Sequence, residues 1–74
     1  MPGHRTKTAA ESARLLHPGT YLTDGNALFN MLGELPDEPS LCLLEDCRTY
    51  DVLVVHIDDL RSSSVREVRV RAAA

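Results

Sequence analysis

The sequence predicts a small single domain that is mostly β, with about five antiparallel strands. Two observations carry this prediction. The segment from Leu41 to Ile57 has two apolar runs around a short polar stretch, which is typical of a β-hairpin. The pair Asp24-Gly25 lies between two further apolar stretches, and Asp-Gly is a favoured hairpin turn. With 74 residues, the chain has room for one domain.

Residues 1–17 are predicted to form a flexible N-terminal segment with a short marginal helix. Thr8-Ala9-Ala10-Glu11 fits a capping box, in which the threonine and the glutamate cap each other's backbone N–H groups. The helix is expected to start at Thr8 and to run to about Leu16, because Pro18 disfavours helix at the residue before it. Its apolar stripe is weak, so we expect a frayed or docking helix outside the core.

Residues 20–32 are predicted to form the first hairpin. A two-residue turn at Asp24-Gly25 would pair Thr23 with Asn26 and would place Leu22 and Phe29 on one face. A helix over residues 26–32 is the alternative, because alanine, leucine and methionine favour helices. We favour the strand.

Residues 33–40 are expected to form a loop, because they contain two prolines and three acidic residues. The second hairpin follows, and residues 46–49 are its predicted four-residue connection. Each of its strands is apolar on both faces. A chain this small has little with which to cover both, so the hairpin must lie under other elements, curl into a barrel or pair with a second chain.

Residues 58–62 are predicted to form one helical turn, whose acidic start suits the helix dipole. Residues 65–70 alternate in polarity and carry charge, which is typical of an edge strand. The β domain would then span residues 18–71, with residues 72–74 as a tail. Five short strands with a helical turn before the last are similar in layout to a meander or an SH3-like small barrel.

The core is expected to be small. Domains of this size bury only about 60% of their unfolded surface, so they often depend on disulfides, a metal or a partner subunit. The apolar residues expected to fill the core are Leu22, Leu28, Phe29, Met31, Leu32, Leu41, Leu43, Leu44, Val52, Leu53, Val54, Val55, Ile57, Leu60, Val65, Val68 and Val70.

The charge pattern and the apolar hairpin together predict a protein-interaction module. The formal net charge is −3, with acidic residues concentrated in the middle of the chain and arginines near its end. Such a division can be self-complementary within one fold or across a dimer. We therefore predict a non-enzymatic adaptor or regulatory module, with a homodimer through the hairpin or a sheet edge as its concrete form. The residues predicted to make the interaction are Leu41, Leu43, Val52, Val54, Arg66, Arg69 and Arg71.

Two alternatives remain open. The C-terminal arginines could bind nucleic acid, although single-strand binders usually add aromatic stacking residues and this stretch has none. Cys42, Cys47 and His56 resemble part of a zinc site or a redox site, although structural zinc needs four ligands. The favoured prediction is therefore a protein with no metal, no cofactor and no small-molecule substrate.

Enzymatic activity is not predicted, and no residue is assigned a catalytic role. The four glycines are scattered and form no phosphate-binding loop. The sequence contains no Gly-x-Ser-x-Gly element and no supported Ser/His/Asp set.

Residues 1–10 lack the apolar centre of a signal peptide, and no apolar run approaches the length of a membrane span. These features predict a cytoplasmic protein with reduced thiols, and the preference for arginine over lysine indicates a high-GC bacterial source. The segment Leu-Glu-Asp-Cys-Arg-Thr at residues 44–49 resembles one in short uncharacterised proteins of high-GC bacteria. This resemblance extends over about residues 20–70. It implies an intact natural domain, with no function and no site.

Overall fold

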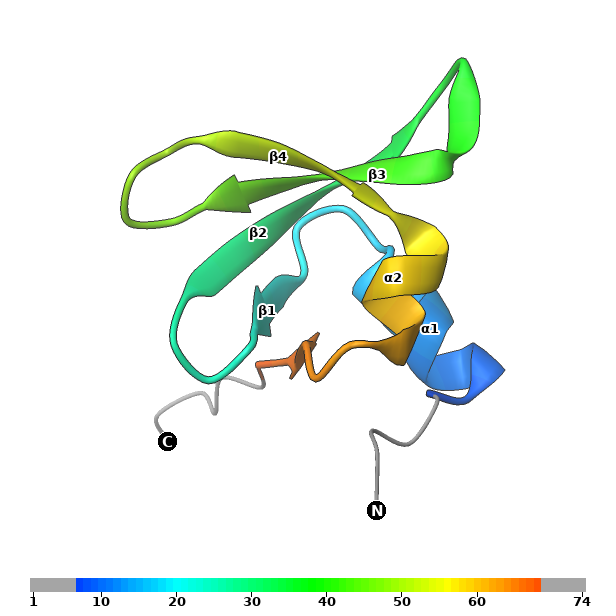
Figure 1. The fold of residues 1–74 in the computed structure, drawn as a ribbon, viewed down its shortest axis with the longest axis horizontal. Coiled ribbons are helices and arrows are strands. Elements are labelled where there is room, and N and C mark those ends of the chain that lie inside the picture. Colours follow the sequence, from blue (N-terminus) through cyan, green and yellow to red (C-terminus); the bar gives the residue numbers. More distant parts are fainter. Residues whose placement is uncertain (1–6, 69–74) are drawn as a thin grey trace, which may run out of the picture.

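The computed structural model describes residues 7–68, which form one five-stranded antiparallel sheet and two short helices (Figure 1). The elements in chain order are α1 (Ala9–Leu15), β1 (Tyr21–Thr23), β2 (Leu28–Leu35), β3 (Glu38–Asp46), β4 (Val52–His56), α2 (Ile57–Ser62) and β5 (Arg66–Glu67). The prediction of a small, mostly β domain with about five antiparallel strands is confirmed. Strands β1 to β4 form a meander, whereas β5 returns to pair with β1, so the order is β4-β3-β2-β1-β5.

Helix α1 begins with the predicted capping box. The backbone N–H of Glu11 donates to Thr8 Oγ1 at 3.1 Å, and the backbone N–H of Thr8 donates to Glu11 Oε1 at 2.8 Å. The prediction of a helix here is confirmed. The prediction that this helix lies outside the core is wrong, because Leu15 is buried among the sheet residues. The domain therefore uses residues before position 18 to complete its core.

Lys7, the first described residue, forms hydrogen bonds to the C-terminal end of α2. Its ammonium donates to the backbone oxygens of Ser63 at 2.6 Å and Leu60 at 3.1 Å. These carbonyls lie at the helix C-terminus, where unpaired oxygens favour a cation. Burial lowers the pKa of Lys7, and the nearby carboxylate of Glu11 opposes that effect.

The first hairpin forms where predicted, but with a different register. Thr23 pairs with Leu28, so the connection has four residues and the predicted two-residue turn is wrong. The carboxylate of Asp24 explains the longer loop, because it accepts the backbone N–H groups of Asn26 at 2.8 Å and Ala27 at 2.9 Å. The register differs from the predicted one by two residues. Each side chain therefore keeps its predicted face.

Strands β2 and β3 form a longer hairpin than the sequence predicts. The expected loop over residues 33–40 is wrong, because β2 continues to Leu35, β3 begins at Glu38, and these two residues pair. The ladder tolerates this extension through two irregularities in register, one next to Gly33. Gly33 is buried with φ +120, a conformation that favours glycine. The preference for a strand over a helix at residues 26–32 is confirmed for the part within β2.

The second half of the chain contains the predicted elements, with changes in their bounds. The connection between β3 and β4 comprises residues 47–51, so it starts one residue later than predicted and has five residues in place of four. Helix α2 contains the predicted helical turn, and Leu60 packs from it into the core. Strand β5 is the predicted edge strand. Residues 69 and 70, assigned to the same strand, lie outside the described residues.

The core lies between one face of the sheet and the two helices, which pack on that face (Figure 1). We call this the inner face. Its buried residues are Leu15, Leu22, Met31, Cys42, Leu44 and Leu60, flanked by the partly buried Leu16, Phe29, Val55, Ile57 and Val65. Five residues expected in the core are instead exposed, because the helices leave part of the sheet uncovered: Leu28, Leu32, Val52, Leu53 and Val54.

Candidate interaction surface

The opposite face of the sheet, which we call the outer face, carries a continuous row of side chains across the strands. The cross-strand pairs Tyr21–Asn30, Asn30–Glu45 and Glu45–Val52 link β1 to β4 in sequence. Cross-strand partners share a face and lie about 5 Å apart. The buried residues of β3 alternate with Glu45, which shows that this row is on the side away from the core.

The four apolar residues predicted to make the interaction come together at one end of this outer face. Leu43 pairs with Val54, and Leu41 and Val52 lie two positions away on the same side of their strands. Leu41 and Leu43 are half-buried, whereas Val52 is 50% and Val54 59% exposed. The structure thus places the predicted apolar set as one patch on β3 and β4.

Strand β4 also offers free backbone groups at the edge of the sheet. The N–H of Asp46 donates to the oxygen of Asp51 at 2.8 Å, which identifies that pair as hydrogen-bonded. Hydrogen-bonded and non-hydrogen-bonded pairs alternate along an antiparallel ladder. The register therefore directs the N–H and C=O groups of Val52 and Val54, and the N–H of His56, away from β3. The C=O of His56 is used by the first turn of α2, because His56 is the N-cap of that helix. The remaining groups form an open edge beside exposed apolar side chains.

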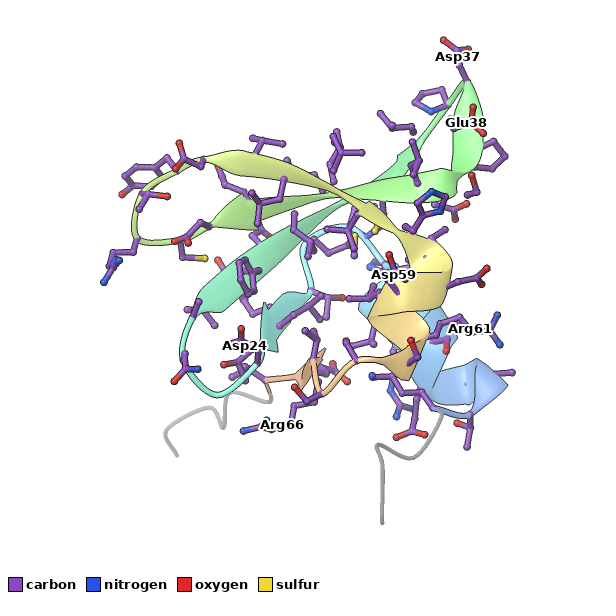
Figure 2. The ribbon with its side chains drawn as sticks, viewed as in Figure 1. Asp24, Asp37, Glu38, Asp59, Arg61 and Arg66 are labelled. Carbon is purple, nitrogen blue, oxygen red and sulfur yellow. The ribbon has the colours of Figure 1, made fainter. Side chains whose placement is uncertain are left out.

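The other edge of the sheet is charged. Arg66 of β5 is exposed, and Glu67 pairs with Arg14 of α1 at 3.3 Å. Figure 2 shows Arg66 near Asp24, at the opposite end of the molecule from Asp37 and Glu38. Arg66 lies on the strand farthest from β4, so the structure does not join it to the apolar patch. Arg69 and Arg71 lie outside the described residues.

Cys42, Cys47 and His56 do not converge. Cys42 is buried on the inner face opposite Val55, whereas His56 lies at the exposed end of β4. Cys47 is five residues from Cys42 along an extended chain, or about 16 Å, which is too far for a disulfide. Both thiols are free. Among residues 7–68, no group of three or more histidine, cysteine or acidic side chains is placed to hold a metal ion.

The environment of Cys42 also argues against reactivity. Burial raises the pKa of this thiol, and the carboxylate of Glu34 raises it further. A thiol with a raised pKa carries less of the nucleophilic thiolate at neutral pH. Cys42 therefore behaves as a small core residue.

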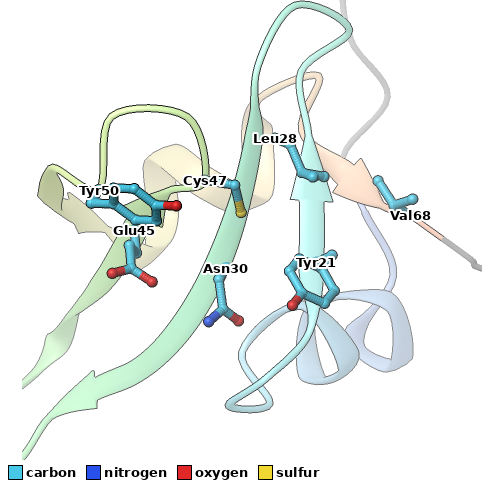
Figure 3. Close-up of a pocket in the computed structure, with 7 residues that line it drawn as sticks. All are labelled: Tyr21, Leu28, Asn30, Glu45, Cys47, Tyr50 and Val68. Carbon is cyan, nitrogen blue, oxygen red and sulfur yellow. The ribbon is translucent and has the colours of Figure 1, made fainter.

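A cavity of about 490 Å³ opens on the outer face beside the β3–β4 loop (Figure 3). Tyr21, Asn30 and Glu45 form its floor from three successive strands, and Val68 extends it beyond β1. Leu28, Cys47 and Tyr50 complete the lining. This cavity could not be predicted from the sequence, because its floor depends on the pairing of Tyr21 with Asn30, whereas the expected register pairs Tyr21 with Leu28.

Tyr50 adopts an unusual backbone conformation at the rim of the cavity. Its φ is +66, the only positive value among the described residues other than glycine. The loop holds it there through the bond from Tyr50 N–H to Asp46 O at 2.7 Å. The Asp46 carboxylate also accepts the backbone N–H groups of Arg48 at 2.8 Å and Thr49 at 3.2 Å. Bulky residues rarely occupy this conformation, and such strain often accompanies a functional role.

Comparison of the chain with protein-family models, curated proteins and solved structures gives no match. Neither helix within residues 7–68 is long and apolar enough to cross a membrane.

Proposed function

We propose that this protein is a non-enzymatic protein-interaction module that pairs with another chain through β4 and the adjoining outer face. The observation that carries the proposal is the open apolar edge at Val52–His56. Added strands bind such edges through main-chain hydrogen bonds, while the side chains beside the edge provide specificity. An adaptor or regulatory role would follow from such pairing.

The contrast between the two edges supports this choice. Natural sheets protect free edges with charges, prolines, bulges or very short strands. Strand β5 has only two described residues, and both are charged, so that edge is protected. Strand β4 has five residues and contains no proline, aspartate, glutamate, lysine or arginine. A sheet that protects its β5 edge but not its β4 edge is expected where β4 pairs with a partner.

A second copy of the same chain is the occupant that the sequence of β4 favours. An antiparallel pair of β4 strands, centred on Val54, would place Val52 opposite His56 of the other copy. No like charges would meet, and the pairing would use the N–H and C=O groups of Val54, the N–H and C=O groups of Val52 and the N–H of His56, whose own C=O already begins α2. Pairing of β4 with β5 would instead place valines against Arg66 and Glu67.

The test is the oligomeric state of Val54→Arg, measured by sedimentation velocity over a range of concentrations. We expect the wild-type chain to form a dimer and the variant to stay monomeric, because each added arginine would face its own copy across the two-fold axis. Val54 is exposed in the single chain, so the variant should keep its circular dichroism spectrum and its unfolding midpoint at low concentration.

Ala10→Arg is the matched control, because it adds the same charge at an exposed position of α1 and should leave the dimer intact. A wild-type chain that stays monomeric up to its solubility limit would contradict pairing with itself. Dimerisation of Val54→Arg as strong as that of the wild type would place the interface elsewhere.

The SH3-like form of the domain is supported by the strand order β4-β3-β2-β1-β5 and by a helical turn just before β5. A cytoplasmic location and a bacterial source rest on the sequence alone. Nucleic-acid binding through Arg66, Arg69 and Arg71 has no supporting observation among the described residues.

A further inference from the structure

The cavity on the outer face is distinct from the β4 edge. None of its lining residues belongs to β4, and its floor is formed by β1, β2 and β3. Figure 3 shows the Asn30 side chain between Glu45 on one side and Tyr21 on the other, with Tyr50 above Glu45. This arrangement of two aromatic rings, one carboxylate and one amide has chemistry of its own.

Two polar groups at the cavity, the Asn30 amide oxygen and the Glu45 carboxylate, can accept hydrogen bonds from a ligand. Asn30 Oδ1 is buried and has no hydrogen-bond partner within the described structure. A buried acceptor without a donor is costly, and such groups in native proteins usually need an explanation. The neighbouring Glu45 carboxylate also accepts only. A ligand that donates to both would satisfy the amide and neutralise the carboxylate.

The aromatic residues favour a cation as that donor. The faces of tyrosine rings attract positive charge, most strongly where water is partly excluded. Tyr21 and Tyr50 line the cavity on either side of Asn30, and among the described residues of the lining Glu45 is the only acidic or basic one. The exposed ring of Tyr50 is held at the rim by a backbone conformation that tyrosine rarely adopts. A role in ligand binding would explain this use of a tyrosine.

We propose that this cavity binds the guanidinium group of an arginine side chain in an extended peptide. A guanidinium is planar, stacks on aromatic rings and carries five N–H donors in a fork. Asn30 and Glu45 are cross-strand partners, so a guanidinium between them can donate to the Glu45 carboxylate and, once the Asn30 amide rotates toward the cavity, to Asn30 Oδ1 as well. Leu28 and Val68 provide apolar surface for the aliphatic stem. The compact ammonium of lysine lacks the planar fork that spans both acceptors.

The test is a titration of the isotope-labelled full chain with acetyl-Ala-Arg-Ala-amide at low ionic strength, followed by NMR. We expect saturable shifts at the amides of Asn30, Glu45 and Cys47. The same peptide with citrulline or lysine in place of arginine should bind at least ~10-fold more weakly. Saturation by all three peptides with similar affinity would overturn the proposal. So would the absence of saturable shifts around the cavity.

Two variants assign the binding to the cavity. Glu45→Gln and Tyr50→Ala should each weaken binding of the arginine peptide at least ~5-fold. Asp58→Asn is the matched control, because it removes the same charge from α2 and should bind like the wild type. An equal loss in Asp58→Asn and Glu45→Gln would show a general effect of charge and would overturn the site.

This test is independent of self-pairing through β4. The Val54→Arg variant keeps every residue of the cavity, so its arginine peptide shifts should reach saturation as in the wild type. A monomeric wild-type chain that still binds the peptide would remove the proposed dimer and leave the cavity proposal in place. A wild-type chain that forms a dimer but does not bind the peptide would remove the cavity proposal and leave the proposed dimer in place.

Discussion

Val54 lies directly opposite Leu43 in the β3–β4 ladder, and its side chain is 59% exposed although it is apolar. The neighbouring strand position, Val55, packs against the core. Both faces of this hairpin carry apolar residues, but the fold treats them differently. The helices pack on the inner face, whereas Val52 and Val54 on the outer face stay exposed.

The first prediction concerns this division of the apolar residues. Leu22→Ala should lower the free energy of unfolding by about 2–5 kcal/mol, because Leu22 is fully buried and its truncation leaves a cavity. Leu32→Ala should cost about 1 kcal/mol or less, because Leu32 is 41% exposed. Urea unfolding of both variants at one low concentration measures the difference. Equal losses would mean that Leu32 is also part of the core.

The second prediction concerns the thiols. A thiol reagent should modify one cysteine of the native chain rapidly and the second only on unfolding. The fast site is Cys47, which is partly exposed in its loop, and the slow site is Cys42, which is fully buried with a raised pKa. Mass spectrometry of the partly labelled chain identifies the site. Rapid native labelling of Cys42 would contradict the packing of the inner face.

The third prediction concerns acid stability. The backbone N–H groups of Ala27 and Asn26 hold the pKa of Asp24 below its usual value of 3.8. A lowered pKa in the folded state contributes stability that is present above pH 3.8 and is lost as the pH falls through the folded value. Asp24→Asn can still accept these bonds but does not titrate. Below about pH 4 the wild type should therefore lose stability relative to the Asp24→Asn variant.

Thermal unfolding of both proteins from neutral pH to pH 2 provides the measurement. A gap that stays constant across this range would show that the Asp24 carboxylate does not prefer its charged form in the folded loop.

The fourth prediction concerns Tyr50. Asparagine tolerates the left-handed region better than tyrosine, so Tyr50→Asn should stabilise the chain by about 0.5–1 kcal/mol. The Tyr50 side chain is 74% exposed and gives up little packing when it is removed. The same variant should bind the arginine peptide more weakly than the wild type. A variant that is less stable than the wild type would show that the ring supports the loop.

The local signals in the sequence were sufficient for the elements that depend on near neighbours. The capping box at Thr8 and Glu11 predicted α1, since both partners lie within one helical turn. Asp24-Gly25 marked the first connection correctly. Its register was wrong, because the side-chain bonds of Asp24 lengthen the loop by two residues.

Features that depend on distant residues were missed. The two prolines of residues 33–40 indicated a loop, but pairing between β2 and β3 with two register shifts carries the strands through it. The hairpin pattern named Leu41, Leu43, Val52 and Val54 as candidate interaction residues, which stays a prediction, whereas the cavity was not predicted. A cavity floor built from three strands requires the register of each, which no local pattern specifies.

The most direct test of the account is amide hydrogen exchange along β4, measured by NMR at a low and a high protein concentration. Pairing through the edge predicts that the amides of Val52, Val54 and His56 gain protection only at the high concentration. The amides of Leu53 and Val55 already bond to β3 and should be protected at both. If the chain dimerises while Val52, Val54 and His56 still exchange as free amides, the β4 edge is not the interface.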